Sequence, residues 1–535
     1  MSTSPETTTA GVETGRGRTV AVSLSRRSAF VDGMRAAVDA LVDETARLYL
    51  EDDVPWVVGY SGGKDSTAVL QLVWLAISQI PAEQRHKTVH VITTDTLVEN
   101  PIVAAWVSRS LDVLGETAEA QGLPIEPHRL TPAVEDSFWV NLIGRGYPAP
   151  RPKFRWCTER LKIKPSNTFI RSVVRSHGEA ILVLGVRKAE SQARAKTMAA
   201  AAAAGRVRDR LSPNVSLPNS LVYSPIEDWT NDDVWTFLMQ VDNPWGYSNR
   251  DLLTLYQGAS SDGECPLVVD STTPSCGSSR FGCWTCTLVD QDKSMTAMIT
   301  NDADKEWMSP LLELRNALDL GDDRNLRDFR RMNGSVQLYG PDQQPIHDQQ
   351  PIHGPYLQSA RHDWLRRLLA AQTEIRQYGP ENVRDIELIT MAELEEIRRI
   401  WVVDKHEFED ALPRIYEQAT GQPYTGPELS ERLALGRTEV EILAELCGDD
   451  RLHFEMVREL LDVEQRHRLK VRRSGLFGAL ESALSKGFYD DAEDAAARAR
   501  RRKAVLAGEV DALDPLDVAD GWVQRSDEHT DGAAE

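Results

Sequence analysis

Residues 55–66 read Pro-Trp-Val-Val-Gly-Tyr-Ser-Gly-Gly-Lys-Asp-Ser, and this stretch decides the fold. Its first six residues predict a short apolar strand, residues 61–66 a glycine-containing turn, and residues 67–80 a helix. A turn that leads from a strand into a helix N-terminus gathers backbone N–H groups at one point, where they can bind a phosphate. The stretch therefore predicts an α/β domain with an anion site at this turn.

Strand and helix patterns alternate on both sides of this stretch. The expected strands are residues 88–95, 125–130, 179–185 and 221–224, and the expected helices are residues 29–50 and 102–121. This alternation predicts a doubly wound parallel sheet. Because ligands lie beyond the carboxyl ends of such strands, we expect the turn at Ser61, Asp95 and the Gly185 loop to meet.

The turn differs from a Walker loop, which would need Gly at position 58 and Ser or Thr at position 65, where this chain has Val58 and Asp65. It resembles the SGGKDS signature of the PP-loop ATP pyrophosphatases. That resemblance implies a PP-loop/HUP-like adenine nucleotide hydrolase fold, and a turn that holds the pyrophosphate of ATP, with Mg²⁺, while the α-phosphorus is attacked. The ATP-binding residues would be Ser61, Gly62, Gly63, Lys64, Asp65 and Ser66. Lys64 would offset developing charge, and the alternative is an ordinary glycine turn.

Three later blocks, residues 155–165, 184–194 and 223–235, resemble the phosphoadenylylsulfate reductase branch of the same superfamily. The likeness covers roughly residues 54 to 250. It implies that Asp95 and Thr96 lie near the adenosine, and that a further set lines the nucleotide or substrate pocket: Arg187, Glu190 and Arg194. For Glu190 and Arg194 the alternative is a salt bridge at helical i,i+4 spacing.

Cys157 lies in a basic stretch of an otherwise acidic chain. Between residues 145 and 164 there are seven Lys and Arg side chains against a single glutamate. Such a surface binds anions and favours the thiolate of a cysteine. We therefore expect Cys157 to be catalytic together with Lys64, and the phosphate-binding side chains to be Arg155, Arg160 and Lys162. The alternative for Cys157 is a buried structural residue.

Four cysteines crowd into one short segment, Cys265, Cys276, Cys283 and Cys286. Four thiolates suit a structural zinc or an iron–sulfur cluster, and their spacing does not decide between the two. A thiol pair at positions 157 and 158, as in reductases with a cluster, is missing because residue 158 is Thr. The reductases' terminal Cys-Gly-His is also missing.

Taken together, the turn, the Cys157 block, the four cysteines and a long helical C-terminal part resemble the DndC family of the bacterial DNA phosphorothioation system, over roughly residues 30 to 480. The likeness implies a [4Fe–4S] cluster and an ATP-dependent sulfurtransferase that adenylates a DNA backbone phosphate and replaces a non-bridging oxygen by sulfur. The implied partners are DNA, a cysteine desulfurase, a DndD-like ATPase and a DndE-like DNA-binding protein. The rival functions are a phosphoadenylylsulfate reductase or sulfate-activation enzyme, and a non-catalytic nucleotide-sensing scaffold.

Length and composition set the frame for these motifs. The 535 residues carry a net charge of −21, and six cysteines are too few for a disulfide framework. The expected organisation is a flexible leader (1–28), a PP-loop domain (29–257), the four-cysteine segment (258–299), a helical domain (300–508) and an acidic disordered tail (509–535). The sequence shows no signal peptide or membrane span, so we expect a cytoplasmic protein without a membrane partner.

Overall fold

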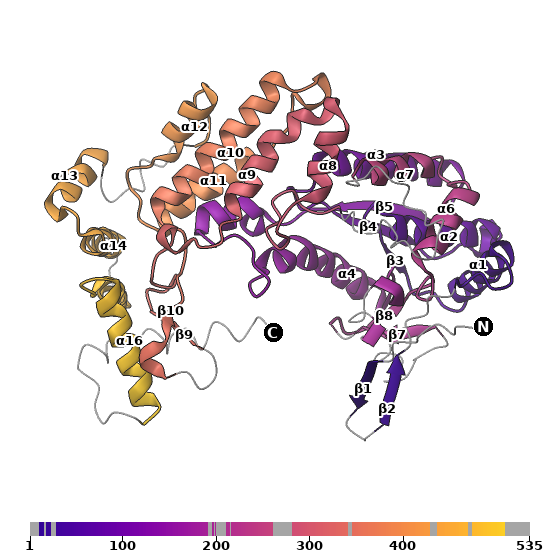
Figure 1. Ribbon diagram of the computed structural model, residues 1–535, viewed down its shortest axis with the longest axis horizontal. Helices are drawn as coiled ribbons and strands as arrows, with labels where there is room; N and C mark the ends of the chain where they lie inside the picture. Colours follow the sequence, from indigo (N-terminus) through magenta and orange to yellow (C-terminus); the bar gives the residue numbers. More distant parts are fainter. Residues whose placement is uncertain are drawn as a thin grey trace, which may run out of the picture. The chain divides into compact units, whose positions relative to one another are not determined.

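The structure is a computed structural model, shown in Figure 1, that describes residues 10–14, 18–22, 28–190, 195–196, 198, 210–214, 216–259, 281–340, 345–427, 436–468 and 473–508. The chain divides into two compact units. The first contains residues 1–133 and 152–312, and the second contains residues 134–151 and 313–535. Residues 134–151, expected within the PP-loop domain, thus belong to the second unit, and the first unit continues past the four-cysteine segment.

A six-stranded sheet forms the centre of the first unit, in the strand order β5-β4-β3-β6-β8-β7. The strands are β3 (Trp56–Gly59), β4 (Val89–Thr94), β5 (Ile125–Leu130), β6 (Ala180–Val183), β7 (Leu211–Pro213) and β8 (Ser220–Tyr223). All neighbours are parallel except β7, which runs antiparallel to β8. The predicted parallel sheet is confirmed for five strands, and the antiparallel β7 is an addition that the sequence did not indicate. A separate hairpin joins β1 (Ala10–Thr14) and β2 (Arg18–Val22).

The helices of the first unit cover both faces of this sheet, because successive side chains of a strand point to opposite sides. Val58 belongs to a core with α1, α2, α3 and α6, whereas its neighbour Val57 packs with Ile170 and Val173 of α4. The helices are α1 (Met34–Leu50), α2 (Lys64–Gln79), α3 (Pro101–Ala120), α4 (Lys164–His177), α6 (Asn231–Gln240), α7 (Asn249–Gly258) and α8 (Lys293–Asn301). Both faces are therefore apolar, as in a doubly wound fold.

Strand order places a ligand crevice at β3. The chain continues from β3 to β4 on one side, and β6 is the neighbour of β3 on the other side. A crevice opens at such a switch point, outside the carboxyl ends of the two strands. The residues that follow β3 and β6 therefore flank one site, as predicted.

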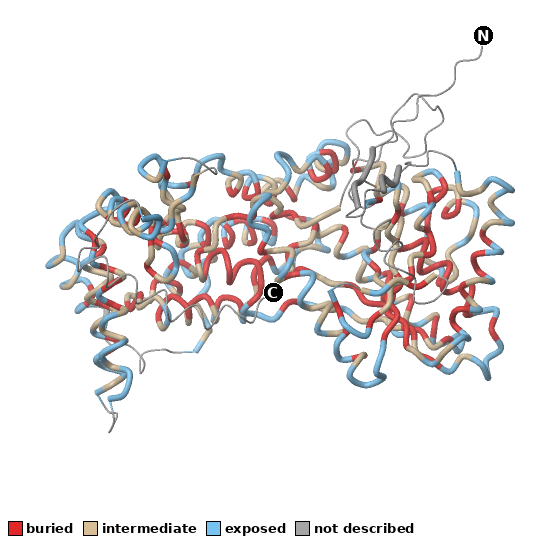
Figure 2. Tube along the Cα trace, turned by 90° about the horizontal axis from the view of Figure 1, so that it is seen from below, coloured by how far each residue is buried: buried red, intermediate tan, exposed pale blue. Residues whose placement is uncertain are grey.

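The second unit is mainly helical, and its buried residues gather between the helices (Figure 2). Its longer helices are α10 (Gln358–Tyr378), α11 (Met391–Arg399), α12 (Leu412–Thr420), α13 (Arg437–Cys447), α14 (Arg451–Arg468), α15 (Leu476–Gly487) and α16 (Ala492–Leu506), and α9 (Ser309–Leu318) spans the boundary between the units. A two-stranded pair joins β9 (Leu338–Tyr339) to β10 (Gln350–Pro351). A capping box of Thr390 and Glu393 begins α11. Among the described residues, no helix combines the length and apolarity needed to cross a bilayer.

Two indole hydrogen bonds hold residues 134–151 in the second unit. The Trp139 Nε1–H donates to the Leu388 carbonyl at 2.8 Å, and the Trp401 Nε1–H donates to the Ile143 carbonyl at 3.0 Å. Both indoles are buried. This placement also takes Arg151 out of the expected anion-binding surface, because its guanidinium lies 2.6 Å from the buried carboxylate of Asp323.

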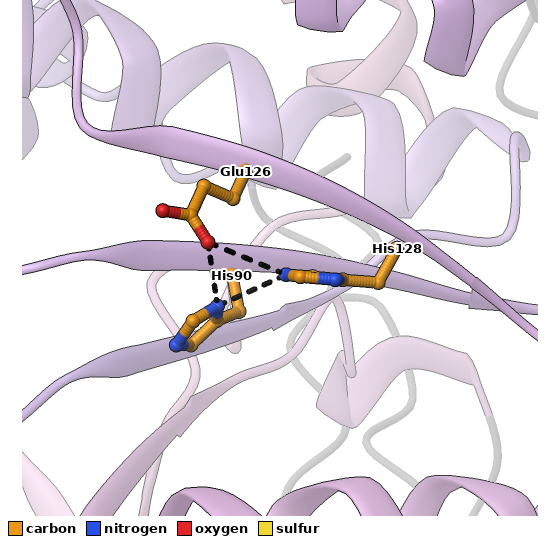
Figure 3. A group of neighbouring side chains, drawn as sticks. All are labelled: His90, Glu126 and His128. Carbon is orange, nitrogen blue, oxygen red and sulfur yellow. Dashed lines mark hydrogen bonds and ion pairs between the residues drawn. The ribbon is translucent and has the colours of Figure 1, made fainter.

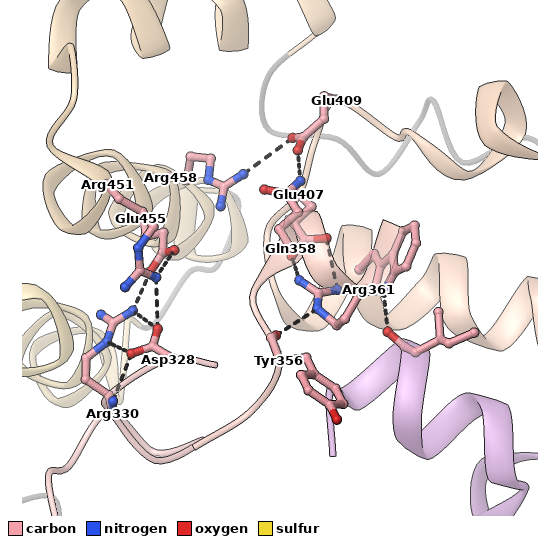
Figure 4. Close-up of polar contacts among 12 residues, drawn as sticks. Asp328, Arg330, Tyr356, Gln358, Arg361, Glu407, Glu409, Arg451, Glu455 and Arg458 are labelled. Carbon is pink, nitrogen blue, oxygen red and sulfur yellow. Dashed lines mark hydrogen bonds and ion pairs between the residues drawn. The ribbon is translucent and has the colours of Figure 1, made fainter. Parts of the chain in front are cut away.

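Buried ion pairs link distant parts of the second unit (Figure 4). Asp328 accepts from Arg330 at 2.7 Å and from Arg451 of α14 at 2.9 Å. Burial by itself raises the pKa of the Asp328 carboxyl, but hydrogen bonds and charges from the two arginines outweigh it and lower the pKa to about 2. The charged form of Asp328 is thus favoured by folding.

Acid should therefore remove the contribution of Asp328 to stability. The pKa of Asp328 is lower in the folded than in the unfolded state, so its contribution to stability is complete above the unfolded-state pKa of ~4. The contribution is lost as the pH falls through the folded-state pKa of about 2. At pH 5 it amounts to ~2 kcal/mol of unfolding free energy. Thermal unfolding of the full chain should show a gap in midpoint between wild type and Asp328→Asn that narrows from pH 5 to pH 3. Asp363→Asn, which removes a partly exposed carboxylate paired with Arg367 on α10, is the control. An equal gap at both pH values would contradict the assignment.

Candidate functional site

The predicted phosphate turn lies where the strand order requires it, between β3 and α2. Gly63 precedes the first residue of α2 with an extended backbone (φ −84°, ψ 163°), so Lys64, Asp65 and Ser66 belong to the first helical turn rather than to the loop. Gly62 has φ +70°, and a Cβ there would lie 2.4 Å from Val107 Cγ2. A side chain at position 62 would therefore be excluded by both conformation and space.

Hydroxyl groups hold the turn in shape. The Ser66 hydroxyl donates to the Gly63 carbonyl at 3.0 Å and accepts from the Ser61 backbone N–H at 3.1 Å. The Ser61 and Ser66 hydroxyl oxygens lie 3.1 Å apart. These contacts close the turn around the N-terminus of α2, whose N–H groups have no intrahelical acceptor and can bind an anion.

Asp65 connects the turn to the loop after β6. Its carboxylate lies 3.1 Å from Lys64 Nζ and 2.6 Å from Arg187 Nε. Arg187 is buried, and its guanidinium also donates to the Trp229 carbonyl at 3.3 Å. The Glu190 carboxylate accepts from the Arg187 backbone N–H at 2.9 Å. Arg187 and Glu190, expected to line the pocket, do so while they fix the turn, whereas Arg194 lies outside the described residues.

Close backbone contact joins the same two loops. A Cβ on Gly185 would lie 2.9 Å from the backbone carbon and oxygen of Asp65 and 3.1 Å from the Ser66 nitrogen. Only a residue without a side chain allows this approach. From its sequence, Gly185 was expected only in a loop beside the site, and its packing role depends on the fold.

Tyr256 of α7 packs over the turn, and no sequence motif had indicated this residue. Its hydroxyl accepts from the Lys64 backbone N–H at 3.4 Å, and Lys64 Nζ lies 5.6 Å from the centre of its ring. Burial raises the pKa of the Tyr256 hydroxyl above its usual value, so this group stays protonated. In the sequence, Tyr256 stands out only by its place in an amphipathic helix, a pattern that also fits an ordinary core residue.

These residues border a cavity of about 880 Å³ within the first unit. It is within the size range of small-molecule and cofactor sites. Its lining includes Ser61, Gly63, Lys64, Asp65, Ser66, Asp95, Glu99, Lys162, Arg187, Glu190 and Tyr256. The expected residues Gly62, Thr96, Arg155 and Arg160 are not part of this lining.

Asp95 and Thr96 follow β4 directly and make different contacts. The Asp95 carboxylate accepts from the Leu97 backbone N–H at 2.9 Å, and Leu97 has the uncommon φ of +64°. Thr96 is fully buried, and its hydroxyl lies 3.1 Å from Glu99 Oε1 and 3.3 Å from Cys283 Sγ. Of the two residues expected near the adenosine, Asp95 reaches the cavity and Thr96 supports its wall.

The described end of the four-cysteine segment docks on this wall. Trp284 N–H donates to the Val98 carbonyl at 2.9 Å, and Asn100 N–H to the Gly282 carbonyl at 3.3 Å. Cys283 thereby faces Glu99, with Sγ 4.0 Å from the carboxylate, and the pKa of its thiol is raised to about 12 by burial and by Glu99. The Cys283–Glu99 pairing joins residues 184 positions apart.

Cys283 and Cys286 fit a metal cluster in the part of the segment that the structure describes. The backbone N–H of Cys286 donates to the Cys283 carbonyl at 3.0 Å, so both residues lie on one turn, and both are half-buried. Two thiols on one turn are the donor pair that a zinc site or an iron–sulfur cluster takes from a C-x-x-C motif. Cys265 and Cys276 lie outside the described residues.

Lys162 lines the cavity and also interacts with two of the cysteines. Its ammonium lies 3.2 Å from Glu99 Oε1. Although burial by itself lowers the pKa of Lys162, Cys283, Glu99 and Cys157 raise it above its usual value. A permanent positive charge therefore lies between the cavity and two thiols.

The expected thiolate at Cys157 needs correction. Burial has the largest effect and raises the pKa of the Cys157 thiol. A hydrogen bond with Thr158 lowers that pKa, Cys286 raises it, and Arg155 lowers it by the smallest amount. Burial outweighs the basic neighbours because Arg155 is exposed and turned towards water, where charges are screened. Cys157 is a protected thiol near Cys286 rather than a permanently ionised one.

Comparison with known proteins agrees with this geometry. The model of the phosphoadenosine phosphosulfate reductase domain matches residues 55–289. Over 191 residues, the chain is 25% identical to an uncharacterized protein of Methanocaldococcus jannaschii. The aligned region covers 36% of this chain and 32% of that relative. The chain thus spans about a third of the length of the curated relative that it matches.

One similar solved structure is FMN adenylyltransferase of Candida glabrata in complex with FMN and the ATP analogue AMPCPP. Its TM-score is 0.24 and its sequence identity 13%, and the match covers 40% of this chain and 61% of that one. The complex of the same enzyme with FAD and inorganic pyrophosphate has a TM-score of 0.24 and 13% identity, covering 46% and 74%. The family match and the geometry of the turn agree on one conclusion. Residues 55–289 resemble a phosphoadenosine phosphosulfate reductase domain, and their described part has the parallel sheet and the turn that a nucleotide-binding PP-loop fold requires.

Proposed function

We propose that the protein is an ATP-dependent sulfurtransferase that acts in DNA phosphorothioate modification. One observation carries the proposal: the cavity that begins at the phosphate turn also contains Lys162, whose charge interacts with both Cys157 and Cys283. A nucleotide site and thiols that share a cationic side chain suit chemistry in which a phosphate is activated and then meets sulfur. The nature of the acceptor, DNA, comes from the resemblance of roughly residues 30 to 480 to the DndC family.

The first step would be adenylation of the acceptor. A non-bridging oxygen of a DNA phosphate attacks the α-phosphorus of ATP, the bond to the β-phosphate breaks, and pyrophosphate leaves. The N–H groups at the start of α2 and the Lys64 ammonium would stabilise the charge that gathers on pyrophosphate. Asp65 and Arg187 would keep the turn in position, since their contact ties it to the loop after β6.

The second step would transfer sulfur from Cys157. A cysteine desulfurase loads Cys157 as a persulfide, whose terminal sulfur attacks the activated phosphorus and displaces AMP. A second thiol then attacks the Cys157 sulfur, which releases the DNA phosphorothioate and leaves a disulfide that an external thiol reduces. The electrons therefore balance with one two-electron reduction per sulfur transferred. Lys162 would favour the anionic forms of sulfur in this step.

The cysteine segment would hold a [4Fe–4S] cluster through Cys265, Cys276, Cys283 and Cys286, and such a cluster supplies electron transfer or structural support when bound. Protein purified without oxygen should show the broad visible absorption of iron–sulfide charge transfer. Serine at both Cys283 and Cys286 should remove that absorption, whereas Cys447→Ser in α13 should keep it. Colourless wild-type protein with one bound zinc would contradict the cluster and favour the zinc alternative.

DNA and the protein partners of the system remain part of the proposal. Lys153 and Arg155 are exposed on the first unit and could contact a backbone phosphate, although Arg155 lies outside the cavity lining. A phosphoadenylylsulfate reductase is the second candidate, favoured by the domain match at residues 55–289. A scaffold without turnover is the third, and it would bind nucleotide at the same turn.

Product analysis tests the three candidates. With desulfurase, cysteine, DNA and ATP, the wild type should form AMP and pyrophosphate in amounts equal to the phosphorothioate recovered from digested DNA. Lys64→Met should lower pyrophosphate release at least ~10²-fold, since it removes a charge that acts on the leaving group, whereas Lys305→Met at the surface should not. Release of orthophosphate first, sulfite formation from phosphoadenylylsulfate, or modification that survives Lys64→Met would reject the proposal.

A further inference from the structure

Three side chains with metal-binding atoms meet on the sheet of the first unit, away from the phosphate turn. His90 lies on β4, and Glu126 and His128 lie on the edge strand β5 (Figure 3). In the parallel register His90 is opposite Glu126, and Ile92 is opposite His128. His90 and Ile92 share a face of β4, which places all three side chains on the side of the sheet that α4 covers.

The distances between their ligand atoms match a metal site. His90 Nδ1 lies 3.0 Å from His128 Nε2, and Glu126 Oε2 lies 3.6 Å from His90 Nδ1 and 3.8 Å from His128 Nε2. Ligands bound tetrahedrally at ~2.0–2.2 Å from zinc are separated by about 3.3–3.6 Å. The three atoms therefore already approximate one face of a tetrahedron.

A hydrogen bond between the two imidazoles explains only part of this arrangement. It accounts for the 3.0 Å distance, but the carboxylate oxygen is too far from both nitrogens for a hydrogen bond. The carboxylate instead points at the space between the rings, as Figure 3 shows. A carboxylate that converges on both rings from beyond hydrogen-bond length is what a shared ion would require.

The surroundings keep the two imidazoles in the form that binds metals. Burial lowers the pKa of both His90 and His128, so the rings are neutral near pH 7. The Phe169 ring of α4 packs against both, with centres 5.5 Å from His90 and 4.7 Å from His128, and so limits their rotation. The Glu126 side chain is 57% exposed, which leaves a path for an ion to enter from solvent.

We propose that His90 Nδ1, His128 Nε2 and the Glu126 carboxylate bind one zinc ion, or a similar divalent transition metal, with water as the fourth ligand. The ion would tie the edge strand β5 to β4. None of these three side chains lines the cavity, although Ile92 of β4 and Arg129 of β5 do, so the ion would lie beside the cavity rather than in it. The site stands independently of the proposed function.

Zinc titration of the full-length protein tests this site. After removal of metals with a chelator, equilibrium dialysis and metal analysis should show one more zinc equivalent in the wild type than in His128→Asn. Glu126→Gln, a change at a half-exposed side chain, should weaken the same equivalent at least ~10-fold. His86→Asn, which alters an exposed histidine outside the group, should bind as the wild type does.

Cobalt separates this site from the cysteine segment. Cobalt(II) at His90, Glu126 and His128 should give a tetrahedral visible spectrum without thiolate-to-metal charge transfer, and this component should be missing in both variants. Equal stoichiometry, affinity and cobalt spectra in wild type, His128→Asn and Glu126→Gln would overturn the site. If His128→Asn folds poorly, Glu126→Gln decides alone, with its thermal midpoint as the measure of folding.

Discussion

Replacing Cys157 by serine is expected to abolish sulfur transfer to DNA while ATP is still converted to AMP and pyrophosphate. Serine fills the same volume but cannot carry a persulfide, so transfer should fall at least ~10³-fold, the scale expected when a nucleophile is removed. The phosphate turn does not contact Cys157 through any hydrogen bond that the structure describes, so DNA-dependent pyrophosphate release should stay within about twofold. Phosphorothioate in digested DNA and pyrophosphate in the same reaction measure the two steps separately.

Cys447→Ser is the matched control, because it changes a half-buried free cysteine in the helical unit. Loading can be followed directly: the wild type incubated with desulfurase and labelled cysteine should gain one labelled sulfur that Cys157→Ser lacks. Transfer within tenfold of the wild-type rate in Cys157→Ser would place the sulfur carrier at another residue. Loss of pyrophosphate release together with transfer would mean that Cys157 supports the nucleotide site rather than carrying sulfur.

Replacing Gly185 by alanine is expected to disrupt ATP binding although position 185 lies outside the phosphate turn. The added Cβ would lie 2.9 Å from backbone atoms of Asp65, and backbone cannot yield as a flexible side chain does. The turn would have to shift, which also disturbs the contact of Asp65 with Arg187. Overpacking of this kind costs ~1–3 kcal/mol, and we expect ATP to bind at least ~10-fold more weakly.

Calorimetric titration with a non-hydrolysable ATP analogue and thermal unfolding test this second prediction. Gly258→Ala is the control, since a Cβ at that position meets no atom within 4 Å. Both ATP affinity and midpoint should be unchanged in the control and lowered in Gly185→Ala. Wild-type affinity in Gly185→Ala would show that the two loops are not held together as tightly as their backbone distances indicate.

Several features of this protein follow from the sequence because they depend on local patterns. The apolar run before Ser61, the glycines of the turn and the alternation of strands and helices specify the parallel sheet and the anion site at its carboxyl edge. The strand predicted at residues 125–130 agrees with β5 in both bounds, and the predicted turn agrees with the start of α2 except that the helix begins earlier. Each of these patterns depends on a few neighbouring residues, so it can be recognised without knowledge of the fold.

The tertiary structure alone decided the contacts between distant residues and the burial that tunes them. Asp65 meets Arg187 across 122 positions, and Lys64 meets Tyr256 across 192. The sequence placed Cys157 among cations and so predicted a thiolate, but its pKa depends on desolvation, which only packing sets. The same holds for residues 134–151, whose assignment to the second unit rests on where Trp139 and Ile143 find hydrogen-bond partners. Local chemistry can be deduced from residue order, whereas burial and long-range pairing exist only once the chain has folded.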